Sequence, residues 1–220
     1  MGFFDTGYFK GNAPRSGLAK KRKINNKVIA WQLDKKYYDG KRINGYGGFK
    51  YDGRWKKFLP KIIKKYKLNK KSKVLDLGCK KGFFVKDLRE LIPGIKVYGI
   101  ENHMYPIKNC QSKVKRYLKY SSYTKLKFKN KYFDFVFAFN SIYSQNLGDV
   151  VKTLKEIQRV SKKSYVVVAS CNNDNERNKF YKWTLIGTTI LYKNEWLKLF
   201  RIIGYKGDYY FSTARTLGLK

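Results

Sequence analysis

The chain has 220 residues and carries 50 Lys and Arg against 15 Asp and Glu, which gives a formal net charge of +35. That length suffices for one substantial core, and no apolar run approaches the roughly 20 residues that a membrane-spanning helix needs. We therefore expect a soluble, cytoplasmic protein with no membrane span. The three cysteines show no C-x-x-C spacing, which favours reduced thiols and indicates no metal site.

The N-terminal third has its own character. Residues 1–26 are rich in glycine and basic residues, which predicts a flexible arm or a flap that becomes ordered only by contact. Apolar residues between 28 and 33 predict a short helix. The segment Tyr37 to Trp55 contains the triplet Y-D-G twice, each time followed by a basic residue, and predicts a series of tight turns. Apolar spacing from Phe58 to Tyr66 then predicts a helix.

The stretch from Val74 to Phe84 reads V-L-D-L-G-C-K-K-G-F-F. Its apolar start predicts a buried strand, and Gly78 and Gly82 permit a sharp bend or a close approach of backbone to a ligand. Apolar residues between 85 and 92 recur at helical spacing. This order of strand, glycine turn and helix is typical of a ligand-binding turn, although an ordinary tight turn has the same pattern.

Strand and helix patterns alternate further along the chain. Lys96 to Ile100 predicts a second strand that ends at Glu101, and Tyr132 to Asn140 predicts a strand buried on both faces. Apolar spacing over 147–160 predicts a helix, and Ser164 to Ala169 predicts another strand. Such alternation predicts an α/β fold: a three-layer α/β/α, mostly parallel sheet whose ligand crevice lies at the carboxyl ends of the strands.

The glycine turn resembles the first motif of the class I S-adenosylmethionine-dependent methyltransferases, an acidic residue followed by G-x-G-x-G. Asp76, Gly78 and Gly82 match, whereas Lys80 stands at the middle glycine position. The resemblance spans roughly 71–211 and implies a Rossmann-like fold, with residues 1–70 as an N-terminal arm and cap or lid and 71–220 as the methyltransferase domain.

The C-terminal end departs from that family. A helix after Asn194 stops at Gly204, and Tyr205 to Phe211 predicts a late strand. Class I enzymes usually finish with two antiparallel strands, and residues 212–220 are too few to supply the second. Either the sheet is truncated, or Thr188 to Tyr192 contributes a strand.

The resemblance also implies a cofactor site for S-adenosylmethionine. Glu101, about 20 residues beyond the glycine turn, is expected to accept hydrogen bonds from the ribose hydroxyls. Lys80 either points its ammonium at the carboxylate of the cofactor or partly fills the site. Cys79 lies in the glycine turn but is better explained as a small packing residue. The expected cofactor-binding residues are Asp76, Gly78, Cys79, Lys80, Gly82, Glu101, Asn102 and Asn140.

In many proteins of this family the region before the first strand shapes the acceptor pocket. The double Y-D-G segment is therefore a candidate lid whose rings stack on a flat or sugar-like acceptor while its arginines hold an anion. Packing of these rings against the sheet edge is the alternative. Residues 172–193 are expected to form a second wall. The expected substrate-binding residues are Tyr38, Arg42, Tyr51, Arg54 and Trp55.

No general base is obvious from the sequence. Tyr143, in the loop after the fourth strand, Asp39, in the candidate lid, and His103, the only histidine, are the candidate catalytic residues. Methyl transfer from a sulfonium depends mostly on alignment and desolvation, with a base needed only where the nucleophile starts out protonated.

The lysine excess has two explanations. A basic surface with interspersed aromatic rings suits nucleic acid. Alternatively, a coding bias spreads lysine along the chain, as in 61–73, 113–131 and 152–163. The 40 lysines against 10 arginines favour bias, because arginine is the more common residue in nucleic-acid grooves. In either case the charge attracts anionic substrates.

The main functional prediction is a methyltransferase that acts on oxygen or nitrogen of a small-molecule or sugar-like acceptor, an anionic one included. An RNA or tRNA methyltransferase is the first alternative, favoured by charge, but residues 140–143 (N-S-I-Y) do not resemble N-P-P-Y. The second alternative is a non-catalytic nucleic-acid-binding protein on a degenerate methyltransferase fold, favoured by Lys80 and by the lack of an obvious base.

Overall fold

The computed structural model describes residues 1–9 and 16–219, and a seven-stranded sheet forms its centre. The strands are β1 (Lys73–Leu77), β2 (Lys96–Glu101), β3 (Leu118–Tyr120), β4 (Phe133–Phe139), β5 (Ser161–Cys171), β6 (Leu191–Tyr192) and β7 (Asp208–Ser212). Their order is β3-β2-β1-β4-β5-β6, with β7 also paired to β5. Each pairing between these strands is parallel, which confirms the predicted parallel sheet.

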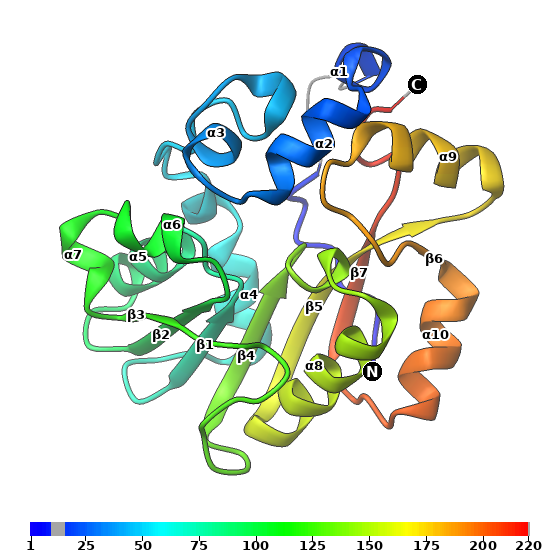
Figure 1. Cartoon of the computed structure of the whole chain (residues 1–220). Helices are drawn as coiled ribbons and strands as arrows, with labels where there is room; N and C mark the ends of the chain where they lie inside the picture. Colours follow the sequence, from blue (N-terminus) through cyan, green and yellow to red (C-terminus); the bar gives the residue numbers. More distant parts are fainter. Residues whose placement is uncertain (10–15, 220) are drawn as a thin grey trace.

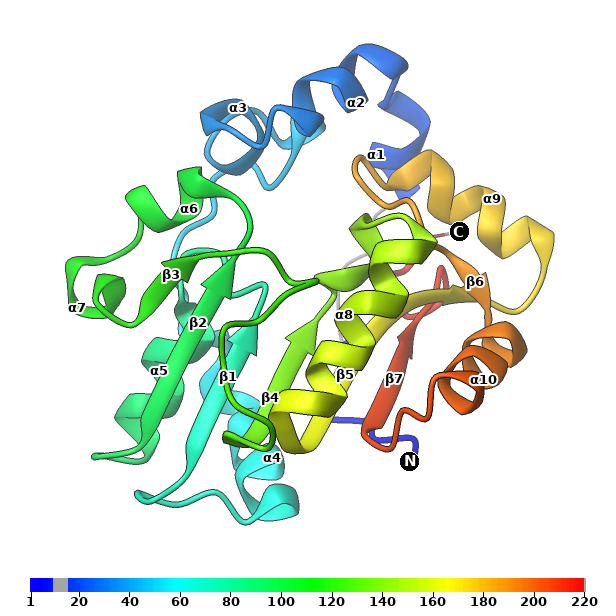
Figure 2. The same cartoon turned by 60° about the horizontal axis from the view of Figure 1, so that its bottom comes forward.

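Helices cover both faces of the sheet, as Figures 1 and 2 show. On one face lie α4 (Leu59–Tyr66) and α5 (Phe83–Leu91), and on the other lie α8 (Leu147–Val160) and α10 (Lys193–Ile202). Three more helices are α6 (Met104–Lys108), α7 (Ser112–Lys115) and α9 (Asp174–Trp183). The three-layer prediction is confirmed. None of the described helices is long and apolar enough to span a membrane.

The two hydrophobic clusters explain the near-continuous apolar runs of the central strands. In β5, Tyr165 and Val167 pack with α4 and α5, while Val166 and Val168 pack with α8 and α10. Successive strand residues point to opposite faces, so a strand covered by helices on both sides needs apolar residues at every position.

The C-terminal strands differ from the antiparallel pair usual in class I enzymes. The two residues of β6 pair with Ser170 and Cys171, so the segment before α10 does contribute a short strand. The longer β7 pairs with Tyr165 to Ala169 and also runs parallel to β5. The sheet therefore ends without an antiparallel strand among the described residues.

The first nine residues are held against β7. Phe3 forms a bridge with Tyr209, and the Phe4 N–H donates to the Tyr209 carbonyl at 2.9 Å. The Phe4 ring packs edge-on against Tyr66 and Tyr165. The sequence predicted either a flexible arm or a flap ordered by contact, and residues 1–9 are ordered by contact with β7. Residues 10–15 of the predicted arm lie outside the described residues.

Residues 16–49, which we call the cap, lie over the carboxyl ends of the strands (Figure 1). A small cluster of Ala30, Tyr37 and Tyr38 packs with Leu185 beneath it. Gly45 allows the turn to close, because a Cβ there would lie 1.9 Å from the Tyr37 carbonyl oxygen. The cap contains α1 (Ser16–Lys21), α2 (Ile24–Trp31), α3 (Lys35–Tyr38) and the 3-10 turn η1 (Arg42–Asn44), and a second such turn, η2 (Arg54–Lys57), follows it.

Two leucines of α8 test the packing of the helical layer. Leu154 is fully buried, and we expect Leu154→Ala to lower the free energy of unfolding by about 2–5 kcal/mol through reduced burial and a residual cavity. The same substitution at Leu147, 48% exposed, should change it by no more than about 0.5 kcal/mol. Urea denaturation measures both, and equal losses would contradict the assignment of Leu154 to the core.

Candidate active site

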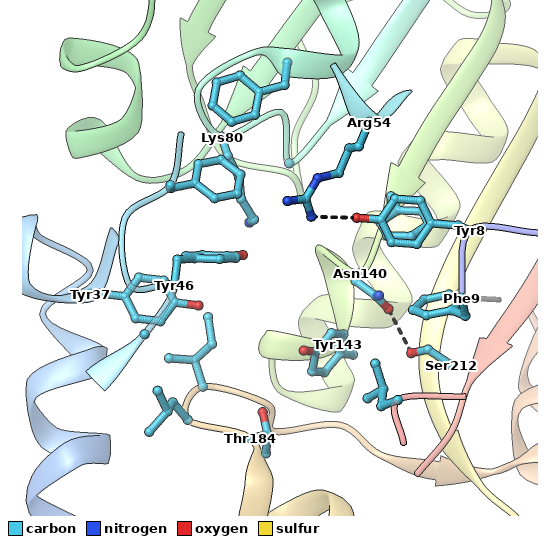
Figure 3. A pocket seen from close by; sticks show the side chains of 18 of the residues that line it. Tyr8, Phe9, Tyr37, Tyr46, Arg54, Lys80, Asn140, Tyr143, Thr184 and Ser212 are labelled. Carbon is cyan, nitrogen blue, oxygen red and sulfur yellow. Dashed lines mark hydrogen bonds between the residues drawn. The ribbon is translucent and has the colours of Figure 1, made fainter. Parts of the chain in front are cut away.

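A cavity of about 240 Å³ lies at the carboxyl ends of β1 and β4, beneath the cap (Figure 3). The strand order reverses between β1 and β4, and open α/β sheets bind ligands at such a point. The predicted second wall is present, since Phe180 and residues 183–186 line the cavity opposite the glycine turn.

The backbone of the glycine turn explains its sequence. Gly78 has φ +88°, and a Cβ there would lie 2.1 Å from the Cβ of Ser141. The Ser141 hydroxyl donates to the Leu77 carbonyl at 2.7 Å, and the Gly78 N–H donates to the Ile100 carbonyl at 2.8 Å. Only glycine therefore lets the turn approach the loop after β4 this closely.

Lys80 directs its side chain into the cavity (Figure 3). Its backbone is left-handed, with φ +50°. Burial lowers the pKa of the Lys80 ammonium, but the Glu101 carboxylate and smaller contributions from other nearby groups together outweigh this, so the net pKa is raised. Within the described part of the chain, the ammonium has no hydrogen-bond or ion-pair partner. The cavity thus holds a charged group that can bind an anion.

Asp76 also lines the cavity and is buried. Burial raises the pKa of its carboxyl to about 8, the charge of Glu101 adds to the rise, and Lys80 partly offsets it. A carboxyl with this pKa is largely protonated at neutral pH and can both donate and accept a hydrogen bond.

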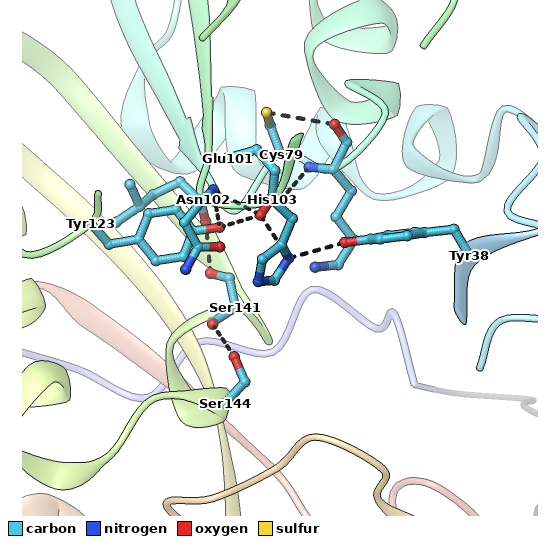
Figure 4. A network of polar contacts seen from close by, with 10 residues as sticks. Tyr38, Cys79, Glu101, Asn102, His103, Tyr123, Ser141 and Ser144 are labelled. Carbon is cyan, nitrogen blue, oxygen red and sulfur yellow. Dashed lines mark hydrogen bonds and ion pairs between the residues drawn. The ribbon is translucent and has the colours of Figure 1, made fainter. Parts of the chain in front are cut away.

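The Glu101 carboxylate is fully buried and has four contacts (Figure 4). It accepts hydrogen bonds from the Lys80 N–H at 2.9 Å, the Asn102 N–H at 2.9 Å and the Tyr123 hydroxyl at 2.8 Å, and His103 Nδ1 lies 3.2 Å away. Glu101 does not line the cavity. A ribose can reach this carboxylate only if some of these contacts are broken.

Tyr38 of the cap covers this network. A hydrogen bond of 3.1 Å joins its hydroxyl to His103 Nδ1, and its side chain is fully buried. Burial lowers the pKa of the His103 imidazole, an effect that Glu101 opposes. The candidate base His103 therefore sits between Glu101 and the cap and does not line the cavity.

Asp39 joins the cap to Lys81 beside the glycine turn and to Tyr105 after β2. Its carboxylate accepts hydrogen bonds from Lys81 Nζ at 2.7 and 2.8 Å, from the Tyr105 hydroxyl at 2.8 Å and from the Phe49 N–H at 3.1 Å. Burial raises the pKa of Asp39, but these hydrogen bonds outweigh it and hold the pKa below its usual value. Asp39 does not line the cavity, so its geometry suits a latch better than a base.

Tyr143 is the candidate catalytic residue that does line the cavity, on the 3-10 turn η3 (Ile142–Ser144). Asn140 lies beside it with φ +48° and accepts a hydrogen bond from the Ser212 hydroxyl at 3.0 Å. Figure 3 shows both side chains at the cavity wall near the end of β7.

The expected substrate-binding residues divide into two groups. Arg42, Arg54 and Trp55 line the cavity. Tyr38 is a fully buried residue of the cap, and Tyr51 donates its hydroxyl to Asp87 at 2.6 Å; neither residue lines the cavity. Among the expected cofactor residues, Asp76, Gly78, Cys79, Lys80 and Asn140 line the cavity, whereas Gly82, Glu101 and Asn102 do not.

The sequence did not point to several residues of the cavity, among them Tyr8, Phe9 and Arg22. Arg22 lies in a basic run, K-K-R-K, where no pattern distinguishes it from its neighbours. Its place in the cavity depends on how the cap folds back over the sheet.

Comparison with known proteins identifies the family of this chain. A family model described as a methyltransferase domain matches residues 68–204. No curated protein matches the chain. Among solved structures, YcgJ from Bacillus subtilis is 16% identical, with a TM-score of 0.56 and 66% of each chain covered. A putative methyltransferase from Haloferax volcanii, solved in complex with a methyltransferase activator, is 20% identical, with a TM-score of 0.54.

A third solved structure, a SAM-dependent methyltransferase from Archaeoglobus fulgidus, is 18% identical, with a TM-score of 0.51 and 68% of each chain covered. The alignment with the Haloferax protein covers 66% of each chain, so this chain spans just under two thirds of that one. At these identities the neighbours establish the Rossmann-like fold.

The raised pKa of Asp76 predicts a pH dependence of stability. The native carboxyl keeps its proton up to about pH 8, whereas an ordinary carboxyl, with a pKa of 3.8, releases it. Stability from this group is therefore fully present below a pH of 3.8 and falls as the pH rises towards 8. Asp76→Asn should remove this decline, as measured by urea midpoints across that range, while Asp149→Asn on the surface of α8 should retain it. Parallel profiles for Asp76→Asn and the unmodified protein would contradict the assignment.

Proposed function

Because the chain belongs to the methyltransferase domain family, we propose that it binds S-adenosylmethionine in the cavity between β1 and β4 and methylates oxygen or nitrogen of a small acceptor. The observation that carries this proposal is the meeting of Asp76, Lys80 and Tyr143 in one cavity at the reversal of strand order. Those side chains come from the glycine turn and from the loop after β4.

The residues present fit the two ends of the cofactor differently. At the methionine end, the ammonium of Lys80 suits the carboxylate and the buried carboxyl of Asp76 suits the amino group. At the adenosine end, Asn102 Oδ1 is buried without a hydrogen-bond partner among the described residues, which suits a donor on the ligand. Glu101 is the expected ribose partner, but Tyr38 and His103 cover it.

We therefore propose that residues 16–49 act as a lid that opens before the adenosine end is bound. Opening breaks the contacts of Asp39 with Lys81 and of Tyr38 with His103, and both contacts join the cap to residues beside the glycine turn or β2. The cavity volume of about 240 Å³ lies just below the range of roughly 300–1,000 Å³ typical of small-molecule sites, which supports a closed state.

In the reaction, S-adenosylmethionine supplies an electrophilic methyl group. The chain supplies alignment and exclusion of water, because rings such as Phe49, Trp55 and Phe139 wall the cavity. Tyr143 lines the cavity, and in this proposal its hydroxyl orients the nucleophile or, once ionised, accepts its proton. An acceptor as large as RNA would have to present its reactive group beneath the cap, so the enclosed cavity favours a small molecule.

Calorimetric titration tests cofactor binding. We expect micromolar binding of S-adenosylmethionine and S-adenosylhomocysteine, and weakening by Asp76→Ala and Glu101→Ala. Lys80→Met should weaken S-adenosylhomocysteine binding about tenfold or more, since it removes a charge-assisted hydrogen bond. Methylthioadenosine, which lacks the amino-acid end, should bind that variant normally. The exposed Lys70→Met controls for net charge, and absence of binding to the unmodified protein would contradict the proposal.

The lid predicts a kinetic effect. Asp39→Asn weakens the ion pair with Lys81, so the closed state is less favoured and S-adenosylhomocysteine should associate several times faster. Stopped-flow tryptophan fluorescence measures this, because Trp55 lines the cavity. Asp149→Asn, which removes an ion pair with Lys152 on α8, should leave the association rate unchanged. Equal rates for Asp39→Asn and the unmodified protein would argue against the lid.

A further inference from the structure

Two arginines of the cap line the cavity without a carboxylate partner among the described residues. Arg22 donates to three backbone carbonyls: Ile43 at 3.2 Å, Arg42 at 3.3 Å and Trp183. Arg42 donates to the Gly45 carbonyl at 2.5 Å. These contacts orient the two guanidinium groups without neutralising them, and each group retains unused N–H donors.

The two positive charges oppose each other. Burial, and to a smaller extent repulsion from Arg42, lower the pKa of the Arg22 guanidinium to about 10. Arg54, the third arginine of the cavity, differs because Asp52 binds it through two oxygens. Arg22 is partly buried and Arg42 is exposed. A partly buried charge beside a like charge is costly unless an anion lies next to it.

Arg22 and Lys80 face a common volume. Tyr37 and Tyr143 interact electrostatically with both cations, and all four residues line the cavity. In the proposed function Lys80 meets the carboxylate of the cofactor, so that carboxylate does not neutralise the two arginines. Asp76 is the acidic side chain among the described lining residues, and its carboxyl is largely protonated. A neutral acceptor would leave this charge uncompensated.

Aromatic rings flank the same volume on two sides. Phe49 stacks on Phe83 with centroids 4.8 Å apart, and Tyr8 meets Phe139 edge-on at 4.5 Å. Tyr46 packs against Phe49 at 4.5 Å. Figure 3 shows Tyr46 and Tyr8 on opposite sides of the cavity. Such walls favour a planar ligand, because ring faces pack against ring faces over a large area.

We propose that the methyl acceptor is a planar organic acid whose carboxylate or phosphate group binds Arg22 and Arg42. This acceptor class rests on the proposed methyl transfer. A guanidinium group binds either oxyanion through paired N–H donors. Because both guanidinium groups belong to the cap, acceptor binding also holds the cap closed over the cavity.

Phenyl phosphate and benzoate are the probes, with phenol as the neutral ring control, titrated into the full-length protein saturated with S-adenosylhomocysteine at physiological ionic strength. We expect phenyl phosphate or benzoate to bind and phenol to bind at least tenfold more weakly, because phenol lacks the oxyanion. Arg42→Gln should weaken binding of the anionic probe about tenfold or more, and Arg42→Lys should restore part of it.

Lys41→Gln is the matched control, since it removes one exposed charge from the neighbouring position. Equal weakening by Lys41→Gln and Arg42→Gln would attribute binding to the general charge of the protein and overturn the site. Arg22→Gln should weaken binding as Arg42→Gln does, but it also removes hydrogen bonds to three carbonyls. If Arg22→Gln fails to fold, the variants of the exposed Arg42 still test the proposal. Equal binding of phenol and the anionic probes would likewise overturn the proposal.

Two further arms separate the sources of the oxyanion. If Arg42→Gln weakens S-adenosylhomocysteine but not methylthioadenosine, the arginines bind the carboxylate of the cofactor and the acceptor assignment is wrong. Displacement of phenyl phosphate by a single-stranded RNA oligonucleotide at high ionic strength would instead indicate an RNA acceptor. If the anionic probes bind through Arg42 but S-adenosylhomocysteine does not bind, the proposed methyl transfer is wrong, while the oxyanion site itself is supported.

Discussion

The buried carboxylate of Glu101 joins four parts of the chain that are distant in sequence. It accepts hydrogen bonds from the glycine turn through the Lys80 N–H and from the segment after β3 through Tyr123, and His103 connects it to Tyr38 of the cap. A buried carboxylate is tolerated only when partners replace its water. The positions of the end of β2, the glycine turn and the cap therefore depend on one another. The shape of the cavity beside them depends on these positions.

Two roles compete for the Glu101 carboxylate: contact with the cap through His103, and the proposed binding of the cofactor ribose. In this structure a Glu101 oxygen lies against His103, which contacts Tyr38 of the cap, whereas the proposed cofactor would need the carboxylate for its ribose. The cap also carries Arg22 and Arg42, whose charges lack a carboxylate among the described residues and lie on the cavity wall. A ligand that binds these arginines would offset the broken link between Glu101 and the cap, because it would tie the cap to the molecules in the cavity. Cofactor and acceptor binding are expected to be coupled through the cap for this reason.

Local patterns predicted most of the fold. The glycine turn, the strand that ends at Glu101 and the apolar run of β4 were visible because strand and helix periodicity arise from neighbours in the chain. The C-terminal strands were harder to predict. β6 has only two residues, and the direction of β7 depends on its pairing with β5, which no local pattern encodes. The order found in residues 1–9 likewise depends on Tyr209, at the other end of the chain.

The candidate site divides in the same way. The sequence by itself determined the glycine turn, the exceptional Lys80 and the family resemblance, since these depend on residue types at short, regular spacing. Only the tertiary structure decided that Asp39 latches the cap, that Tyr38 and His103 cover Glu101, and that Arg22 reaches the cavity. These contacts depend on how the cap folds back over the strand ends. Packing between distant segments determines them, and the periodicity within one segment does not predict such packing.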